Sequence, residues 1–296
     1  MKLKKKLIPL FYMLPGLIIM GAFVFVPIIL SLVMSFFDIK SVGAKWAYAG
    51  VNNFKLAFGD SLFFYAFLRT VGFGAFGMAT GLFFGLLLSV MVAKHKFLGF
   101  YRYIFYLPAV VSMITLGKLW SLMLAPNETG LLNVVAMKFG AKAPINWLGN
   151  PSVTYLVVLG IGLIGCGGGM TLILFTTAIN NIPKELEEAA KAEGANAVQR
   201  AFYITIPMIK PVVSAWAVLS IIGSFKSFEF IFALTGGGPN GTTTTLAILL
   251  YNSGRGSNVG YGTSAAMGLA LTLIVFVFMS AYLFLSGFRK ESDAEV

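Results

Sequence analysis

Long apolar stretches separated by short polar segments run through the whole sequence. A bilayer core about 30 Å thick needs roughly 20 apolar helical residues, and six stretches meet that requirement. The pattern therefore predicts a single all-α integral membrane domain over residues 1–296, with six transmembrane helices. We expect the first stretch to remain as an anchor, because its apolar run is too long for a signal peptide and no small-residue cleavage site follows it. The predicted spans are about 11–36, 63–93, 102–124, 153–179, 211–235 and 264–288.

Lysine and arginine are distributed unevenly between the two sides of these spans. If the N-terminus is cytoplasmic, most basic residues fall on the inner side, as Lys94 and Lys184 do, and few fall on the outer side, as Lys138 does. Positive residues near span ends favour the cytoplasmic side of a membrane. We therefore predict a multi-pass protein of the cytoplasmic membrane with both termini in the cytoplasm.

The composition is typical of a membrane protein and argues against several other classes of protein. Apolar residues make up 58% of the chain and charged residues only 11%, against about 25% in soluble domains. The net charge of +11 is explained by topology and contact with the lipid bilayer, so it requires no nucleic acid. The chain has one cysteine, Cys166, and one histidine, His95, so an intrachain disulfide and a zinc cluster are excluded. We expect no catalytic group and no metal site in this chain.

The polar segment between the fourth and fifth spans has the signals of two short helices. Asn181 is expected to cap the first helix, with Pro183 in its first turn. Gly194 is expected to end that helix in a left-handed conformation. A second helical stretch over about 196–206 is expected to stop at Pro207. The segment therefore reads as a helix–turn–helix outside the bilayer.

This segment resembles a motif of ABC importer permeases, the EAA motif, whose pattern is EAA-x3-G-x9-I-x-L-P. The chain departs from the pattern only at Ile206, where the family has leucine. The resemblance implies that residues 180–210 form a coupling loop that docks on a separate ATPase subunit. It further implies that Glu188 pairs with a basic group of the ATPase. The motif residues are Glu188, Ala189, Ala190, Gly194, Ile204 and Pro207.

Two further segments are similar to the carbohydrate-uptake, MalF-like branch of these permeases. They are Ser224–Glu229 followed by Leu234–Asn240, and the G-x-x-N-F segment Gly50–Phe54. Where relatives often have Asn-Thr at the start of the second span, this chain has Arg69-Thr70. The resemblance implies a heterodimer with a second, MalG-like permease, an ATPase dimer and an extracytoplasmic solute-binding protein in a bacterial cell membrane. The substrate would be a sugar or oligosaccharide.

No cofactor is expected in the chain itself. Gly117-Lys118 has no glycine five positions before Gly117 and is followed by Leu119, so it is not a phosphate-binding Walker A loop. ATP and Mg²⁺ are therefore expected on the partner ATPase. The alternative is an ion-coupled secondary sugar transporter. Such a transporter needs an ion relay near the midplane of the membrane, and Glu229 alone is a weak candidate for that relay.

Charged residues inside predicted spans mark a candidate substrate cavity. A charge at the centre of an inserted helix costs about 2.5–3.5 kcal/mol, so such residues face protein or water rather than lipid. Because some of these charged residues are basic, an acidic sugar stays a candidate substrate together with neutral sugars and polyols. Three alternatives also stay open, namely an ion pair at i, i+3 spacing, snorkelling of the basic side chains, and plain packing of the aromatic residue. The candidates are Arg69, Lys118, Lys226, Phe228 and Glu229.

Glycine repeats mark two of the predicted spans. Gly77, Gly81 and Gly85 lie four residues apart on the second span, a spacing that allows close helix contact. Six glycines crowd the fourth span between Gly160 and Gly169. Tight packing explains them, and a helix that bends during a transport cycle is the alternative.

Overall fold

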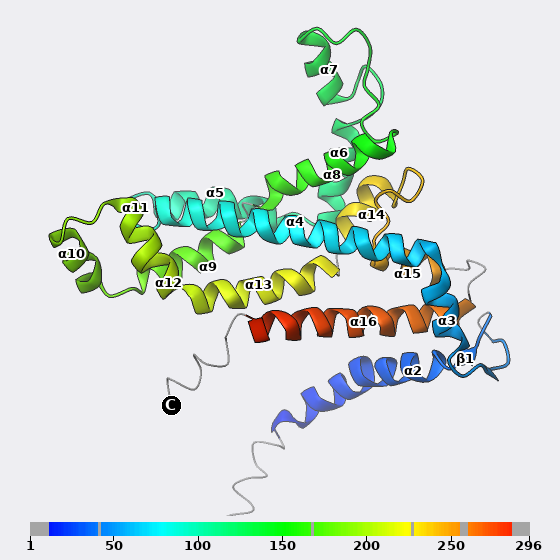
Figure 1. The fold of residues 1–296 in the computed structure, drawn as a ribbon. Helices are drawn as coiled ribbons and strands as arrows, with labels where there is room; N and C mark the ends of the chain where they lie inside the picture. The colour runs from blue at the N-terminus through cyan, green and yellow to red at the C-terminus, as the bar shows by residue number, and fades with distance from the viewer. Residues whose placement is uncertain (1–11, 41–42, 167–168, 226–227, 255–259, 286–296) are drawn as a thin grey trace, which may run out of the picture. The chain divides into compact units, whose positions relative to one another are not determined.

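The computed structural model describes residues 12–40, 43–166, 169–225, 228–254 and 260–285. These residues are mostly helical, and they divide into two compact units (Figure 1). Unit 1 combines residues 1–64 with 249–274, and unit 2 combines 65–248 with 275–296. The all-α class predicted from the apolar stretches is confirmed.

Unit 1 brings together the first and the last apolar stretches of the chain. A short antiparallel pairing of Phe37 with Tyr48 and of Asp38 with Ala47 follows the first helix. The elements that contribute to unit 1 are η1 (Gly21–Phe25), α2 (Val26–Met34), β1 (Phe37–Asp38), β2 (Ala47–Tyr48), α3 (Asn52–Gly59), the start of α4 (Ser61–Val92), most of α15 (Leu246–Gly254) and much of α16 (Gly260–Leu285).

One buried asparagine ties three parts of unit 1 together. Asn53 on α3 is only 3% exposed, and its Nδ2 donates to the carbonyl oxygens of Ser35 and Phe37, each at 2.9 Å. Its Oδ1 accepts a hydrogen bond from Thr263 Oγ1 at 3.1 Å. A Cβ on Gly262 would lie 2.0 Å from the carbonyl oxygen of Phe37, so α16 can approach this joint only with glycine there. The asparagine of the G-x-x-N-F segment is thus the central hydrogen-bonding residue of unit 1.

Replacing Asn53 by alanine should destabilise unit 1 by about 3 kcal/mol, because it leaves buried carbonyl and hydroxyl groups without partners. Unfolding of the purified protein in a denaturing detergent series measures the effect. Asn52→Ala is the matched control, since Asn52 is the exposed neighbour on the same helix. Equal stability of the two variants would contradict this role for Asn53.

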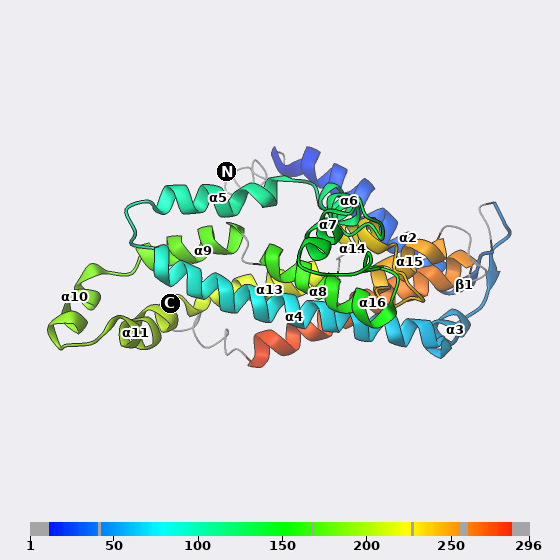
Figure 2. The same ribbon diagram turned by 90° about the horizontal axis from the view of Figure 1, so that it is seen from above.

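Unit 2 holds the remaining helices. α4, α5, α9 and α13 run side by side, and α10 to α12 lie beyond one end of them in both views (Figures 1 and 2). α7 lies beyond α6 and α8, away from these helices (Figure 1). The further elements are α5 (Leu98–Val110), α6 (Met113–Met123), α7 (Leu131–Lys138), α8 (Pro151–Cys166), α9 (Gly169–Asn180), α10 (Lys184–Ala192), α11 (Ala197–Arg200), η2 (Ala201–Thr205), α12 (Ile206–Met208), α13 (Lys210–Phe225) and α14 (Glu229–Thr235).

The apolar stretches differ in how they are built. Within the described residues, three continuous helices have the length and composition to cross a membrane: Tyr12–Met34, Ser61–Val92 and Gly260–Phe284. The fourth stretch contains two shorter apolar helices, Pro151–Gly162 and Gly169–Asn180. The six-span count stays a prediction.

Two of the predicted spans each consist of two helices with a break between them. α5 and α6 are bent by 86° where the sequence predicted one span over 102–124. Pro108 lies inside α5, and Val111 leaves the helix with an extended backbone at φ −77°, ψ 135°. The span predicted over 211–235 is divided between α13 and α14, because Phe228 lies outside both helices.

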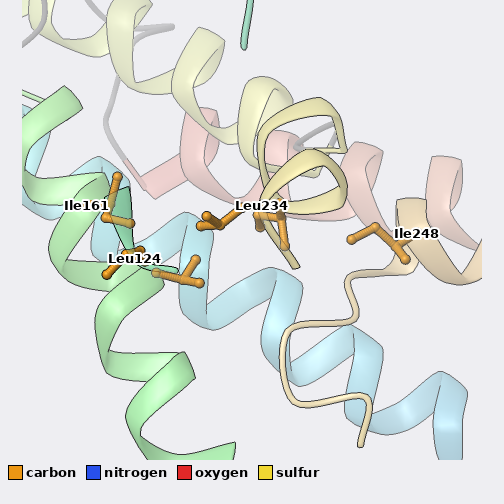
Figure 3. Packing of buried hydrophobic residues seen from close by; sticks show 6 residues of the cluster. Leu124, Ile161, Leu234 and Ile248 are labelled. Carbon is orange, nitrogen blue, oxygen red and sulfur yellow. The ribbon is translucent and has the colours of Figure 1, made fainter. Parts of the chain in front are cut away.

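A hydrophobic cluster joins α6, α8, α14 and the first turn of α15 (Figure 3). α6 and α14 pack so closely that a Cβ on Gly117 would lie 2.8 Å from the carbonyl oxygen of Phe230. Because packed interiors tolerate little change of volume, this cluster fixes the short α14 against the rest of unit 2. Its buried members are Leu124, Val158, Ile161, Ile231, Leu234 and Ile248.

Close helix contact accounts for two of the glycines. A Cβ on Gly85 of α4 would lie 2.4 Å from Thr171 Cγ2, and one on Gly169 of α9 would lie 2.2 Å from Tyr106 Cα. Gly160 and Gly162 have open space, with nothing within 4 Å of such an atom. Packing therefore explains Gly85 and Gly169. Gly167 and Gly168, to which the bending alternative also applies, lie outside the described residues.

Candidate functional site: the α10–α12 loop

The first helix of the loop, α10, begins after a proline. Pro183 is the N-cap residue at φ −53°, ψ 131°, and no side chain caps this end. The predicted Asn181 cap is therefore wrong. Asn181 instead directly follows Asn180, the last residue of α9, and its N–H donates to the carbonyl oxygens of Thr177 and Ala178, each at 3.2 Å. Gly194 has φ +84°, which confirms the predicted left-handed turn after α10.

The second helical stretch begins with a capping box that was not predicted from the sequence. Asn196 accepts a hydrogen bond from Gln199 N–H, and the Gln199 side chain accepts one from Asn196 N–H, each at 2.8 Å. The Asn-x-x-Gln spacing was the available signal for this capping box. A π-helical turn over Ala201–Thr205 precedes Pro207, and the helix continues to Met208. The predicted end at Pro207 is one residue early, because proline is accommodated in a first helical turn, here that of α12.

The motif residues lie on or beside these short helices and are largely accessible. Glu188, Ala189, Gly194 and Pro207 are exposed, whereas Ala190 and Ile204 are half-buried. Large apolar side chains are exposed beside them. Val198 and Phe202, each 64% exposed, lie four residues apart and so on one side of their helix. Tyr203 is 81% exposed and Leu186 on α10 is 44% exposed. The loop therefore presents a carboxylate together with apolar surface.

Both roots of the loop, meaning the residues where it begins and ends, pack against the end of α4. Ile182 before α10 and Ile209 after α12 are buried in one cluster with Ala93 and Ile179. Sequence reasoning missed this joint, because it unites residues far apart in the chain. The half-buried residues packed against it are Leu86, Val90, Ala178 and Val213.

An ion pair adds a polar contact at the same place. Lys94, just after α4, pairs with Glu187 on α10, and the Glu187 side chain is only 15% exposed. Glu185 and Glu188 on the same helix are exposed. The three glutamates therefore differ in environment, which their sequence spacing did not reveal.

Arg102 holds α5 to α9 near this end of unit 2. Its Nε and Nη2 donate to Thr176 Oγ1 at 2.9 and 2.7 Å, and Nη2 also reaches Thr177 Oγ1 at 3.1 Å. Thr176 in turn donates to the carbonyl oxygen of Leu172 at 2.6 Å. From the sequence alone, an arginine near a span end indicated only topology.

The substrate-cavity candidates are distributed over three helices of unit 2. Arg69 on α4 is half-buried and lies over the ring of Tyr155, with its Cζ 5.5 Å from the ring centroid, and its buried Nη1 has no hydrogen-bond partner. Lys118 on α6 is exposed. Glu229 is exposed in the first turn of α14, where the helix dipole favours an acidic residue. Lys226 lies outside the described residues.

Phe228 has a packing role. Its ring is stacked on that of Phe232, with centroids 4.7 Å apart and planes inclined by 20°, and it packs against the cluster of Figure 3. Thr70, next to Arg69, is fully buried and accepts a hydrogen bond from Leu246 N–H at 2.9 Å. These contacts favour the packing alternative for Phe228 and a structural role for Thr70.

The loop after α14, which includes the glycine-rich segment, is tightly hydrogen-bonded. Gly236 and Gly237 have φ +63° and +94°, a conformation that disfavours side chains. Thr243 Oγ1 lies 2.7 Å from Thr235 Oγ1 and donates to the carbonyl oxygen of Gly238 at 2.9 Å. The glycine and threonine residues of this segment thus fix a defined turn.

A second buried asparagine organises the connection around α7. Asn133 Nδ2 donates to the carbonyl oxygens of Ala125 and Ile145 at 2.9 and 3.0 Å. Its Oδ1 accepts from Ile145 N–H and from Trp147 Nε1, each at 2.9 Å. Nothing in the local sequence distinguished this asparagine from an exposed one.

Comparison with known proteins gives a consistent family. The model of the family described as "Binding-protein-dependent transport system inner membrane component" matches residues 77–288. The chain is 29% identical to the probable ABC transporter permease protein YurN of Bacillus subtilis, over 96% of this chain and 98% of that one. It is 31% identical to the arabinooligosaccharides transport system permease protein AraP of the same organism, over 97% and 90%. It is 30% identical to the trehalose/maltose transport system permease protein MalF of Thermococcus litoralis, over 94% and 93%.

A solved structure shares the fold. A chain of a bacterial ABC transporter involved in the import of the acidic polysaccharide alginate superposes with a TM-score of 0.82 at 24% identity, over 96% of this chain and 97% of that one. A second structure, of a bacterial alginate ABC transporter in complex with alginate pentasaccharide-bound periplasmic protein, gives a TM-score of 0.81 at 23% identity.

Proposed function

Because the chain belongs to the family of binding-protein-dependent transport system inner membrane components, we propose that it carries a sugar or oligosaccharide across the bacterial cytoplasmic membrane as one permease subunit of an ABC importer. The curated relatives AraP and MalF are named as permeases of oligosaccharide and disaccharide transport systems. The observation that carries the proposal is the loop of α10 to α12. It extends beyond the ends of α4, α5 and α9 and presents Glu188 beside exposed apolar side chains (Figures 1 and 2).

The loop suits a docking surface for a separate ATPase subunit. Exposed aromatic and aliphatic groups such as Phe202 and Tyr203 bury well in an interface, and Glu188 offers a charge for a basic partner. In the proposed assembly, an ATPase dimer binds this loop and the equivalent loop of a second, MalG-like permease. ATP and Mg²⁺ are bound by the ATPase. The ATPase dimer closes because ATP binds its closed state more tightly, and the closure shifts the two permeases between inward-facing and outward-facing states.

The sidedness follows from the basic residues. The positive-inside rule puts the loop with Lys184 and Lys191 in the cytoplasm, together with both termini. The connection around α7 and the turn after α14 then face outward, where an extracytoplasmic solute-binding protein delivers the sugar. The ordered turns held by Asn133 and Thr243 support such a role, because a defined surface lowers the entropic cost of binding.

Which class of sugar is transported depends on the charged residues of unit 2. Arg69 and Lys118 are positive groups, and Arg69 keeps a buried N–H without a partner. A carboxylate on the substrate would compensate such a charge. Uronate-bearing oligosaccharides are therefore included with neutral sugars and polyols in the test below.

The proposal is tested by reconstitution in proteoliposomes of the chain with the permease, ATPase and binding protein encoded beside it. Uptake of labelled oligosaccharide should require ATP on the loop side and the binding protein on the other side, and should be unchanged by an uncoupler. Uptake that stops with the uncoupler at constant ATP would favour an ion-coupled transporter instead. Preference for uronate-bearing over neutral analogues would support recognition of a substrate carboxylate by Arg69 and Lys118, and equal transport would count against it.

A further inference from the structure

The ion pair between Lys94 and Glu187 joins the coupling loop to a long helix. Lys94 follows the last residue of α4, Val92, by two positions, and Glu187 lies on α10. The Lys94 side chain is 46% exposed and that of Glu187 is 15% exposed. The pair therefore lies at the border between the packed end of unit 2 and solvent.

The pair lies beside an apolar joint. Ile182 and Ile209 are 7% and 2% exposed, and both pack with Ala93, the residue before Lys94. Apolar contact of this kind holds the roots of the loop but is non-directional. A charge-assisted hydrogen bond has a preferred geometry, so it can define the orientation of one helix against another. The apolar joint thus attaches the loop to α4, and the ion pair orients α10.

We propose that Glu187, through Lys94, is a positioning residue that makes α10 and the cytoplasmic end of α4 move together when the ATPase displaces the loop. Without the pair, α10 can tilt about Ile182 and Ile209 while α4 stays in place. The ATPase then hydrolyses ATP with less movement of the membrane helices. This inference rests on the proposed function, since it assigns a role within the coupling of that importer.

Because the ion pair is partly exposed, an effect of its loss on coupling can be distinguished from an effect on folding stability. A half-exposed ion pair contributes little to folding stability, because water and salt screen it. Loss of the pair should therefore leave the unfolding transition and the bound ATPase nearly unchanged. A defect in uptake per ATP hydrolysed would then report on coupling.

The test uses the full importer in proteoliposomes with three variants and one control. Glu187→Gln and Lys94→Gln remove the pair, and the double variant Glu187→Lys with Lys94→Glu restores it in reverse. Glu185→Gln is the matched control, because it neutralises an exposed glutamate on the same helix that lies outside the motif. Sugar uptake, ATP hydrolysis and the amount of bound ATPase are measured in each sample.

We expect each single glutamine variant to retain the ATPase but to lower uptake per ATP by roughly fivefold, a coupling change of about 1 kcal/mol. The reversed pair should regain most of the wild-type ratio, and Glu185→Gln should match the wild type. An unchanged ratio in the glutamine variants, or failure of the reversed pair to restore it, overturns the positioning role. Loss of bound ATPase in Glu187→Gln also overturns it, because Glu187 would then be a docking contact. In each of these cases, ATP-dependent uptake by the wild type would leave the proposed function intact.

Discussion

Replacing Glu188 by arginine is expected to abolish ATP-dependent uptake and to release the ATPase subunit from the purified complex, while the chain still inserts in the membrane. Glu188 is exposed on α10 and lies next to Ala189, whose small side chain allows a partner to approach closely. Reversing a charge in such an interface leaves the basic group of the partner facing another positive charge. The cost is about 2–5 kcal/mol, which lowers affinity by a factor of roughly 30 or more.

Copurification from detergent and uptake in proteoliposomes measure this effect. Glu185→Arg makes the same charge change on the same exposed helix outside the EAA motif, so it should retain the ATPase. A Glu188→Arg complex that keeps the ATPase and transports normally would refute the assignment of the coupling loop.

Replacing Gly169 by valine should severely disrupt the packing of unit 2. A Cβ at this position would lie 2.2 and 2.4 Å from the Cα and N of Tyr106, and 2.5 Å from the carbonyl oxygen of Phe105. These are backbone atoms, so no side chain can rotate away and α5 must separate from α9. We expect a loss of about 3 kcal/mol or more, with the Arg102 hydrogen bonds to Thr176 weakened as the helices part.

Yield of monodisperse protein and resistance to proteolysis check this expectation. Gly162→Val adds the same side chain to the same apolar stretch where nothing lies within 4 Å, so it should be tolerated. If both valine variants were equally stable, the close approach of α5 and α9 at Gly169 would be wrong.

Several features that depend on nearby residues were predicted from the sequence, whereas the N-terminal caps of α10 and α11 were not. The apolar stretches gave the all-α membrane class, because burial in lipid is decided by composition over about 20 residues. The turn at Gly194 followed from the preference of glycine for left-handed backbone, and the structure confirms it. The family resemblance likewise rested on short motifs and is confirmed by the match over residues 77–288.

Features that depend on distant partners could not be predicted. Hydropathy is the same for a straight helix and a bent one, so the 86° bend between α5 and α6 left no signal beyond Pro108. Glu187 is equivalent to Glu185 and Glu188 in sequence, and it acquires its partner Lys94 only when the fold brings α10 close to the end of α4. Asn53 and Asn133 are similarly ordinary in sequence, and only the fold reveals that each satisfies several buried backbone groups.

The sharp corner between α5 and α6 has a consequence for what surrounds the protein. Val111 and Ser112 are exposed and extended at this corner, and the Ser112 side chain does not cap the first N–H groups of α6. Irregular backbone at membrane depth is tolerated only against protein or water, because hydrocarbon offers no hydrogen bonds. Because the corner lies within the span predicted over 102–124, we expect it on a face that acyl chains do not solvate. We expect its neighbours to be another protein surface or an aqueous path through the membrane.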